Sequence, residues 1–150
     1  MFAPKKILVP TDFSVYADNA LKQAIDIAKQ NKAKIYLFHV IDDGFQQCAV
    51  DYCLNEGDVQ RILKESIKNA QDKLHQEVKK ITDSNSKVEI VYDAKRGIPY
   101  EEILKEQEEK GIDLIVIASH GKTGILKNLL GGVVNKIMKS AKCQVLLVRS

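Results

Sequence analysis

The residues best suited to chemistry lie between positions 118 and 132. This stretch opens on Ala118-Ser119-His120-Gly121-Lys122-Thr123-Gly124 and ends on two adjacent glycines, Gly131 and Gly132, directly before a helical pattern. Glycines let backbone N–H groups approach an anion closely, and the free N–H groups of a helix start favour negative charge. The pattern indicates a site for a phosphate-bearing small molecule. The alternative is a glycine loop that only turns the chain, with its lysines in solvent.

The charge distribution favours the same region. The chain carries 23 Lys+Arg and 20 Asp+Glu, which gives a net charge of +3. Positions 111–150 hold six of the basic side chains and a single acid, Asp113, so the remainder of the chain is slightly acidic. This asymmetry suits a phosphate group near the glycine loop. A net charge of +3 is too small to indicate nucleic-acid binding.

Two widespread phosphate motifs are excluded. Gly121-Lys122-Thr123 resembles the end of a Walker A loop, but Val116 stands where that loop requires its first glycine. No G-x-G-x-x-G occurs in the chain, so dinucleotide binding of the Rossmann type has no support.

Five short apolar runs predict the strands that must position this loop. They are rich in Val and Ile, are bounded by turn residues, and cover positions 7–9, 35–41, 88–92, 114–118 and 145–148. The first, fourth and fifth runs hardly alternate, which is typical of strands in the middle of a parallel sheet. Asp93 is expected directly after the third strand.

Segments with helical spacing lie between the strands. We expect helices over positions 17–28, with Ser14 as the N-cap, and over 59–81. A third helix starts at Pro99 and stops at Gly111. The last follows Gly132 and is expected to bury Val133, Val134, Ile137, Met138 and Ala141. This alternation predicts one α/β domain over residues 1–150, a parallel sheet with helices on both faces. The mixed stretch 42–57 is expected to form a long loop.

Composition sets further bounds. The 150 residues are 45% hydrophobic and 29% charged, which fits one ordinary globular domain. No apolar run approaches the roughly 20 residues of a membrane span, and the start lacks a secretory signal pattern. Three cysteines give no disulfide framework. We therefore expect a cytoplasmic protein that binds neither membrane nor nucleic acid.

Several separated motifs make the chain similar to the universal stress protein family. They are KILVPTDFS at Lys6–Ser14, Phe38-His39-Val40, the loop Ala118–Gly124, and CQVLLV at Cys143–Val148. The resemblance spans nearly the whole chain. It implies a five-stranded sheet in the order 3-2-1-4-5, the adenine nucleotide alpha-hydrolase-like fold. It also implies a homodimer formed through the last strand, near Val145–Val148.

The ATP-binding branch of that family has the pattern G-x2-G-x9-G-(S/T), from which this chain departs twice. Ala118 replaces the first glycine, at a strand end where a methyl group is tolerable. Gly132 replaces the Ser/Thr and removes one hydroxyl, while its backbone N–H remains. One neutral hydrogen bond is worth about 0.5–1.5 kcal/mol, so its loss weakens binding by roughly two- to tenfold.

The resemblance implies a site for ATP, or for AMP or ADP, with Mg2+ accompanying the phosphates. The base and ribose are expected near Pro10, Thr11, Asp12 and Val40. The remaining expected contacts come from Ala118, Ser119, His120, Gly121, Lys122, Gly124, Gly131, Gly132, Val133 and Val134. Asp12 is expected to bond the ribose or help to hold a metal, or to serve as a turn residue before the first helix; these roles are compatible.

Other reactive side chains have simpler interpretations. His39 is expected to be hydrogen-bonded and largely buried, and not a catalyst. Cys48 and Cys53 lie in the long loop with four residues between them, as a redox-responsive pair or as unrelated thiols. Cys143 precedes a buried strand and is expected in the core.

Three functions remain open on the sequence. The first is a stress-response protein that binds an adenine nucleotide and signals or protects through its dimer, without efficient turnover. The second is a dimeric interaction protein of the branch that binds no nucleotide. The third is a slow ATPase that uses Asp12. A receiver-like phosphorylation domain with Asp12 and Asp93 is disfavoured, because only one acid follows the first strand.

Overall fold

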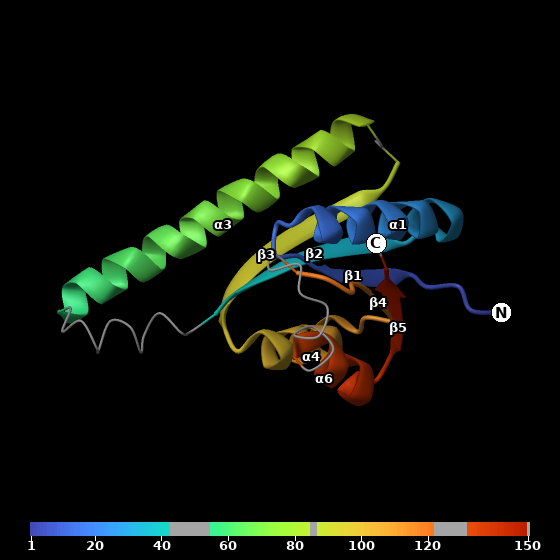
Figure 1. The fold of residues 1–150 in the computed structure, drawn as a ribbon. Helices are drawn as coiled ribbons and strands as arrows, with labels where there is room; N and C mark the ends of the chain where they lie inside the picture. The colour runs from blue at the N-terminus through green and yellow to red at the C-terminus, as the bar shows by residue number, and fades with distance from the viewer. Residues whose placement is uncertain (43–54, 85–86, 122–131, 150) are drawn as a thin grey trace.

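A five-stranded parallel sheet organises the molecule, with its strands in the order β3-β2-β1-β4-β5 (Figure 1). This computed structural model describes residues 1–42, 55–84, 87–121 and 132–149. The strands are β1 (Lys6–Pro10), β2 (Lys34–Asp42), β3 (Glu89–Gly97), β4 (Leu114–Ala118) and β5 (Gln144–Val148). The helices are α1 (Val15–Asn31), α3 (Glu56–Ser84), α4 (Pro99–Lys110) and α6 (Val133–Ser140). The predicted α/β class and strand order are confirmed.

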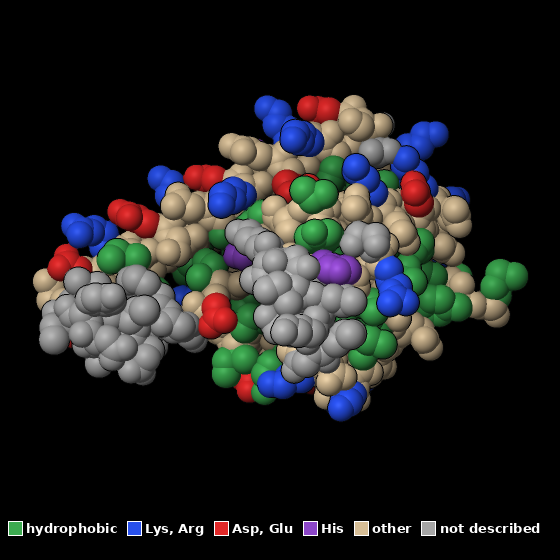
Figure 2. Space-filling model, viewed as in Figure 1, with side chains coloured by type: hydrophobic (Ala, Val, Ile, Leu, Met, Phe, Trp, Pro, Cys, Tyr) green, Lys and Arg blue, Asp and Glu red, His purple; other side chains and the backbone are tan. Residues whose placement is uncertain are grey.

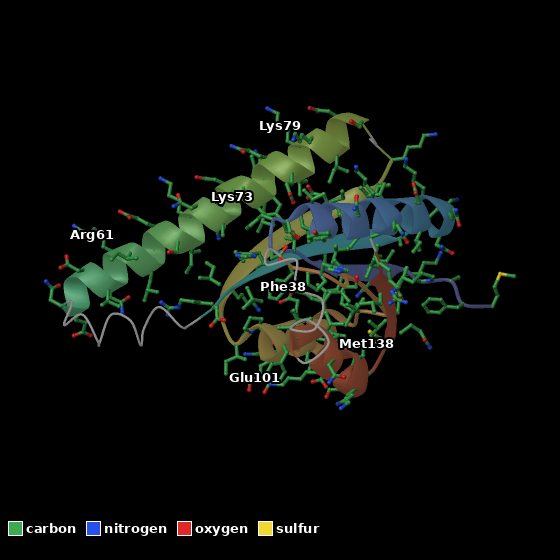
Figure 3. The ribbon with its side chains drawn as sticks, viewed as in Figure 1. Phe38, Arg61, Lys73, Lys79, Glu101 and Met138 are labelled. Atoms are coloured by element: carbon green, nitrogen blue, oxygen red, sulfur yellow. The ribbon has the colours of Figure 1, made fainter. Side chains whose placement is uncertain are left out.

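The helices cover both faces of the sheet (Figure 1). Side chains alternate along each strand, so Ile7 and Val9 of β1 pack with α1 while Leu8 packs toward α4 and α6. Phe38 is 2% exposed and belongs to the core on the α4 and α6 side of the sheet. Arg61 and Lys79 instead point outward from α3 (Figure 3). Two apolar cores therefore fix the sheet on which the candidate loops stand.

Local signals set the helix ends as expected. The Ser14 hydroxyl accepts the Ala17 N–H at 3.1 Å and caps α1. Pro99 opens α4, and Gly111 closes it in the left-handed conformation with φ 64°. Helix α3 extends beyond the predicted 59–81, because the Asn55 side chain accepts the Asp58 N–H at 2.8 Å just before its first turn.

Three expectations from the sequence are wrong. The fifth strand lies at an edge of the sheet, where Val145, Leu146 and Leu147 are half-buried, so its unbroken apolar run does not mark a central position. Met138 is 52% exposed on α6 and is not a core residue (Figure 3). Asp93 lies within β3, paired in register with Phe38, because β3 continues to Gly97.

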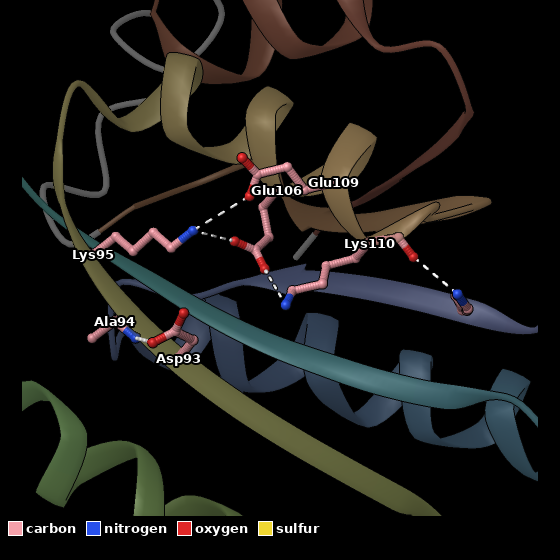
Figure 4. A network of polar contacts seen from close by, with 7 residues as sticks. Asp93, Ala94, Lys95, Glu106, Glu109 and Lys110 are labelled. Carbon is pink, nitrogen blue, oxygen red and sulfur yellow. Dashed lines mark hydrogen bonds and ion pairs between the residues drawn. The ribbon is translucent and has the colours of Figure 1, made fainter.

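An ion-pair network joins β3 to α4 (Figure 4). Lys95 Nζ lies 3.1 Å from the Glu106 carboxylate and 3.7 Å from that of Glu109, and Lys110 approaches Glu106 at 4.0 Å. The Glu106 side chain is 3% exposed. Hydrogen bonding to Glu106 raises the pKa of Lys95, which favours the ammonium form of this side chain.

Candidate functional site

A cavity of about 220 Å3 lies where β1, β2 and β4 end. Its walls are mostly apolar, with a few polar side chains among them, which is the composition of a small-molecule site. Parallel strands present their carboxyl ends on one edge of the sheet, and ligands of open α/β sheets bind there. The lining residues are Pro10, Thr11, Asp12, Ala17, Phe38, His39, Val40, Pro99, Ile103, Ile117, Ala118, His120, Gly121, Val133 and Val134.

The first wall is a turn held by its own side chains. Phe13 N–H donates to the Thr11 hydroxyl at 3.0 Å, and Ser14 N–H donates to the Asp12 carboxylate at 3.0 Å. The turn requires a left-handed Phe13, with φ 64°, which is uncommon for a bulky residue. Asp12 is therefore a turn residue, as one interpretation of the sequence expected, and its side chain also lines the cavity.

Two histidines border the cavity, and each ring is fixed in place. His39 Nδ1 lies 2.7 Å from the Thr11 carbonyl, and its ring packs against Phe13 with centroids 4.5 Å apart. His120 Nδ1 lies 2.9 Å from the Ser119 hydroxyl, and its ring stacks on Tyr16 at 5.1 Å. In the view of Figure 2, histidine side chains lie beside hydrophobic ones near the middle of the visible surface. His39 is hydrogen-bonded, as predicted.

The start of α6 forms the opposite wall. Gly132 is the N-cap residue of α6, and no side chain of the described residues caps this helix. The first turn of a helix carries N–H groups without intrahelical partners, together with the positive end of the helix dipole. Val133 and Val134 of that turn line the cavity. This wall is suited to an anion.

The structure brings together most of the predicted residues that it describes. Nine of them line the cavity: Pro10, Thr11, Asp12, Val40, Ala118, His120, Gly121, Val133 and Val134. Ser119 is 3% exposed beneath His120, and Gly132 directly precedes the lining residues of α6. Neither belongs to the lining. Lys122, Gly124 and Gly131 lie outside the described residues, as do Cys48 and Cys53.

Sequence reasoning missed six lining residues: Ala17, Phe38, His39, Pro99, Ile103 and Ile117. Phe38, Ile103 and Ile117 are core residues whose apolar patterns indicate burial without indicating a cavity. Pro99 carries only the signal of a helix start, which does not indicate a cavity. His39 carried the one usable signal, because a polar residue near the carboxyl end of a strand is a candidate for that edge of the sheet.

One further cysteine prediction falls within the described chain. Cys143 is half-buried and packs against the core on the α4 and α6 side of the sheet. Burial, followed by the charge of Asp113, raises the pKa of its thiol, so the neutral thiol is favoured.

Comparison with known proteins establishes the family. Residues 4–149 match the model of the Universal stress protein family. Universal stress protein MJ0577 of Methanocaldococcus jannaschii is 31% identical over 161 aligned positions, covering 97% of this chain and 94% of that protein. Universal stress protein MJ0531 of the same organism is 34% identical, covering 97% and 82%. The chain belongs to the universal stress protein family.

Solved structures share the adenine nucleotide alpha-hydrolase-like fold. The structure of MJ0577 superposes with a TM-score of 0.76 at 32% identity, over 99% of this chain and 98% of that one. An Arabidopsis thaliana family member with AMP bound has a TM-score of 0.66 at 21% identity, over 97% and 92% of the two chains. A universal stress protein in complex with cAMP has a TM-score of 0.63 at 21% identity, over 99% and 98%.

The helices of the described chain differ from membrane-spanning helices. None of them is both long enough and apolar enough to cross a bilayer.

Proposed function

We propose that this protein binds ATP, or AMP or ADP, in the cavity at the carboxyl ends of β1, β2 and β4. One observation carries the proposal: an apolar cavity is bounded on one side by Asp12 and on the other by the first turn of α6, which no described side chain caps. The apolar walls suit a nucleobase, the carboxylate suits a ribose hydroxyl, and the helix start suits a phosphate.

The size of the cavity determines how the ligand lies. Pockets for drug-sized ligands usually measure about 300–1,000 Å3, whereas this one measures about 220 Å3. It therefore takes the base and ribose, and the phosphates extend past Gly121 and Val133 at the start of α6. Lys122, Gly124, Gly131 and Gly132 complete the phosphate contacts in this proposal.

The two structures that hold AMP and cAMP support the choice of an adenine nucleotide. They show that this fold accommodates adenine nucleotides. The support for binding by this chain comes from its own cavity, because both proteins are only 21% identical to it.

Magnesium accompanies the phosphates in this proposal. Asp12 is the one carboxylate among the described lining residues, and Mg2+ is usually held by one or two carboxylates together with substrate phosphates. The donor set therefore fits an ion carried by the nucleotide. No arginine lies among the described lining residues to stabilise a phosphoryl transition state, so we propose binding without efficient turnover. Phosphate release no faster from the wild type than from Asp12→Ala supports this.

The protein acts as a cytoplasmic homodimer in this proposal, signalling or protecting in stress through its nucleotide state. The free edge of β5 and its half-buried apolar side chains support pairing near Val145–Val148.

Calorimetric titration of the protein with ATP·Mg and with AMP tests the proposed site. Val40→Glu places a larger, charged side chain in the cavity wall, where it occupies the space proposed for the base and ribose. Val40 is half-exposed, so the fold tolerates the change. We expect saturable heat from the wild type and at least a tenfold weaker affinity in the variant.

Met138→Glu is the matched control. It makes the same apolar-to-acid change at an exposed position of α6 outside the cavity lining, and we expect wild-type affinity. An absence of heat and of thermal shift from the wild type at millimolar nucleotide would favour the interaction protein without nucleotide. Equal affinity in Val40→Glu would place the nucleotide elsewhere.

A further inference from the structure

Helices α1 and α3 enclose two carboxyl groups between them, on the face of the sheet opposite α4 and α6. A hollow of about 280 Å3 lies between the two helices. Its apolar walls come from both, and charged side chains complete it. The lining residues are Asp18, Leu21, Lys22, Ile25, Glu77, Lys80 and Ile81.

One oxygen of the Glu77 carboxylate has an unusual environment. Its Oε2 is fully enclosed and has no hydrogen-bond donor among the described residues. The Asp18 carboxyl of α1 lies within hydrogen-bonding reach of the Glu77 carboxyl. Two ionised carboxylates can only accept, so they repel one another, whereas one proton between them makes an O–H···O hydrogen bond. A shared proton therefore satisfies the enclosed oxygen and removes the repulsion.

The surroundings of Glu77 favour the protonated form. Burial is the largest cause, and together with the charge and hydrogen bond of Asp18 it raises the pKa of Glu77 from 4.5 to about 7. The Lys80 ammonium on α3 acts in the opposite direction. Lys22 of α1 also lines the hollow. No sheet residue of the described chain lines it, so Asp18, Lys22 and Lys80 are the charged groups that face Glu77.

We propose that Asp18 and Glu77 form a proton-dependent latch: they share one proton across the α1–α3 contact, and loss of that proton weakens the docking of α3. The folded protein keeps this proton where an unfolded chain has lost it. Stability is therefore greatest below about pH 4.5 for this pair and declines as the pH rises through about 7. The latch does not depend on nucleotide binding.

The latch adjoins the candidate site on both helices. Ala17, next to Asp18, lines the cavity, and Tyr16 stacks on His120. On α3, Lys73 lies one turn before Glu77, with its Nζ 5.3 Å from the centre of the Phe13 ring. Loosening of the α1–α3 contact therefore acts on the elements that carry the first wall of the cavity.

Carbon-13 NMR titration of the side-chain carboxyls measures the proton directly. We expect the Glu77 carboxyl in the intact protein to titrate with a midpoint near 7, and to shift toward 4.5 in Asp18→Asn. A wild-type midpoint near 4.5 would overturn the latch. This measurement decides the question even if a Glu77 variant fails to fold.

Thermal unfolding between pH 5 and 8 measures the consequence. Glu77→Gln keeps a donor for Asp18 and cannot titrate, so its melting temperature should fall less across this range than that of the wild type. Glu65→Gln removes one carboxylate from an exposed position of the same helix and is the control; it should keep the wild-type slope. Equal slopes in Glu77→Gln and the wild type would refute the proposal.

Discussion

The turn from Thr11 to Ser14 shows how single residues connect the fold to the site. Its three consecutive side-chain bonds use Thr11, Asp12 and Ser14 to hold backbone N–H groups. Residues of this type compete well for nearby backbone groups, which is why they are common at turns and helix starts. Thr11 and Asp12 also line the cavity. The same short segment therefore starts α1 and shapes the wall of the site.

Removal of the α1 cap should have a modest and specific cost. Ser14→Ala leaves the Ala17 N–H without its side-chain acceptor, and we expect a loss of about 1 kcal/mol in the free energy of unfolding. For a chain of this length that corresponds to a decrease of roughly 2–4 °C in melting temperature. Calorimetry provides the measurement. Ser14→Gly, which suits an N-cap backbone, should lose only a few tenths of a kcal/mol; equal losses in the two variants would contradict this explanation.

Residues whose roles are local could be predicted from the sequence. Ser14 and Gly111 act on chain neighbours, so their types and positions suffice to identify the helix ends. The Asp18–Glu77 pair could not be predicted, because it depends on how α1 and α3 cross, 59 positions apart in the chain. The role of Phe38 as a lining residue could not be predicted either, because its apolar pattern indicates burial without indicating a cavity.

At the scale of elements, the ion pairs of Lys95 secure α4 against β3 (Figure 4). Glu106 is almost fully enclosed, so a missing partner leaves a carboxylate with little access to water. Lys95 is one-third exposed, and Lys110 also approaches Glu106. These features make the cost smaller than that of breaking a fully buried pair.

Lys95→Met should therefore reduce the free energy of unfolding by about 1–3 kcal/mol, as measured by urea denaturation. The double variant Lys95→Met/Glu106→Leu also removes the enclosed carboxylate that has lost its partner. It should therefore recover most of the lost free energy of unfolding. A double variant less stable than the single one would show that Glu106 contributes through contacts other than its pairing with Lys95.

Hydrophobic periodicity predicted the order of strands and helices along the chain. It did not predict the full length of β3 or the edge position of β5. The pattern at 88–92 ends where polar residues begin, yet β3 continues to Gly97, because backbone pairing with β2 through Asp42 needs no apolar side chains. The run at 145–148 is apolar because both cores reach β5, although β4 is its one neighbour among the described strands. The expected order 3-2-1-4-5 came from the family resemblance and is confirmed.

At the scale of the whole molecule, the proposed dimer predicts a mass of twice 16.8 kDa in sedimentation equilibrium. Val145→Glu places a charge on the edge strand of each copy, and a two-fold interface brings the same charge into contact twice. We expect this variant to sediment as a monomer with an unchanged circular dichroism spectrum. Lys139→Glu, at an exposed position of α6, should remain dimeric. A wild type that is monomeric at tens of micromolar would contradict the dimer.

Because the sheet is parallel, the two ends of the described chain lie at opposite edges of it. Lys5 and Lys6 donate their backbone N–H groups to the Asp113 carboxylate, at the edge of the sheet where the strands begin. Val148 instead accepts the Ser119 N–H, at the edge where the strands finish. A dye attached at position 2 therefore lies about one strand length, roughly 16 Å, from Ala118, and ligand binding near Ala118 should hardly change its fluorescence. The same dye attached at position 149 lies near Ser119 and should respond to ligand binding there. Position 2 is therefore suited to immobilising the protein on a surface, and position 149 to detecting ligand binding by fluorescence.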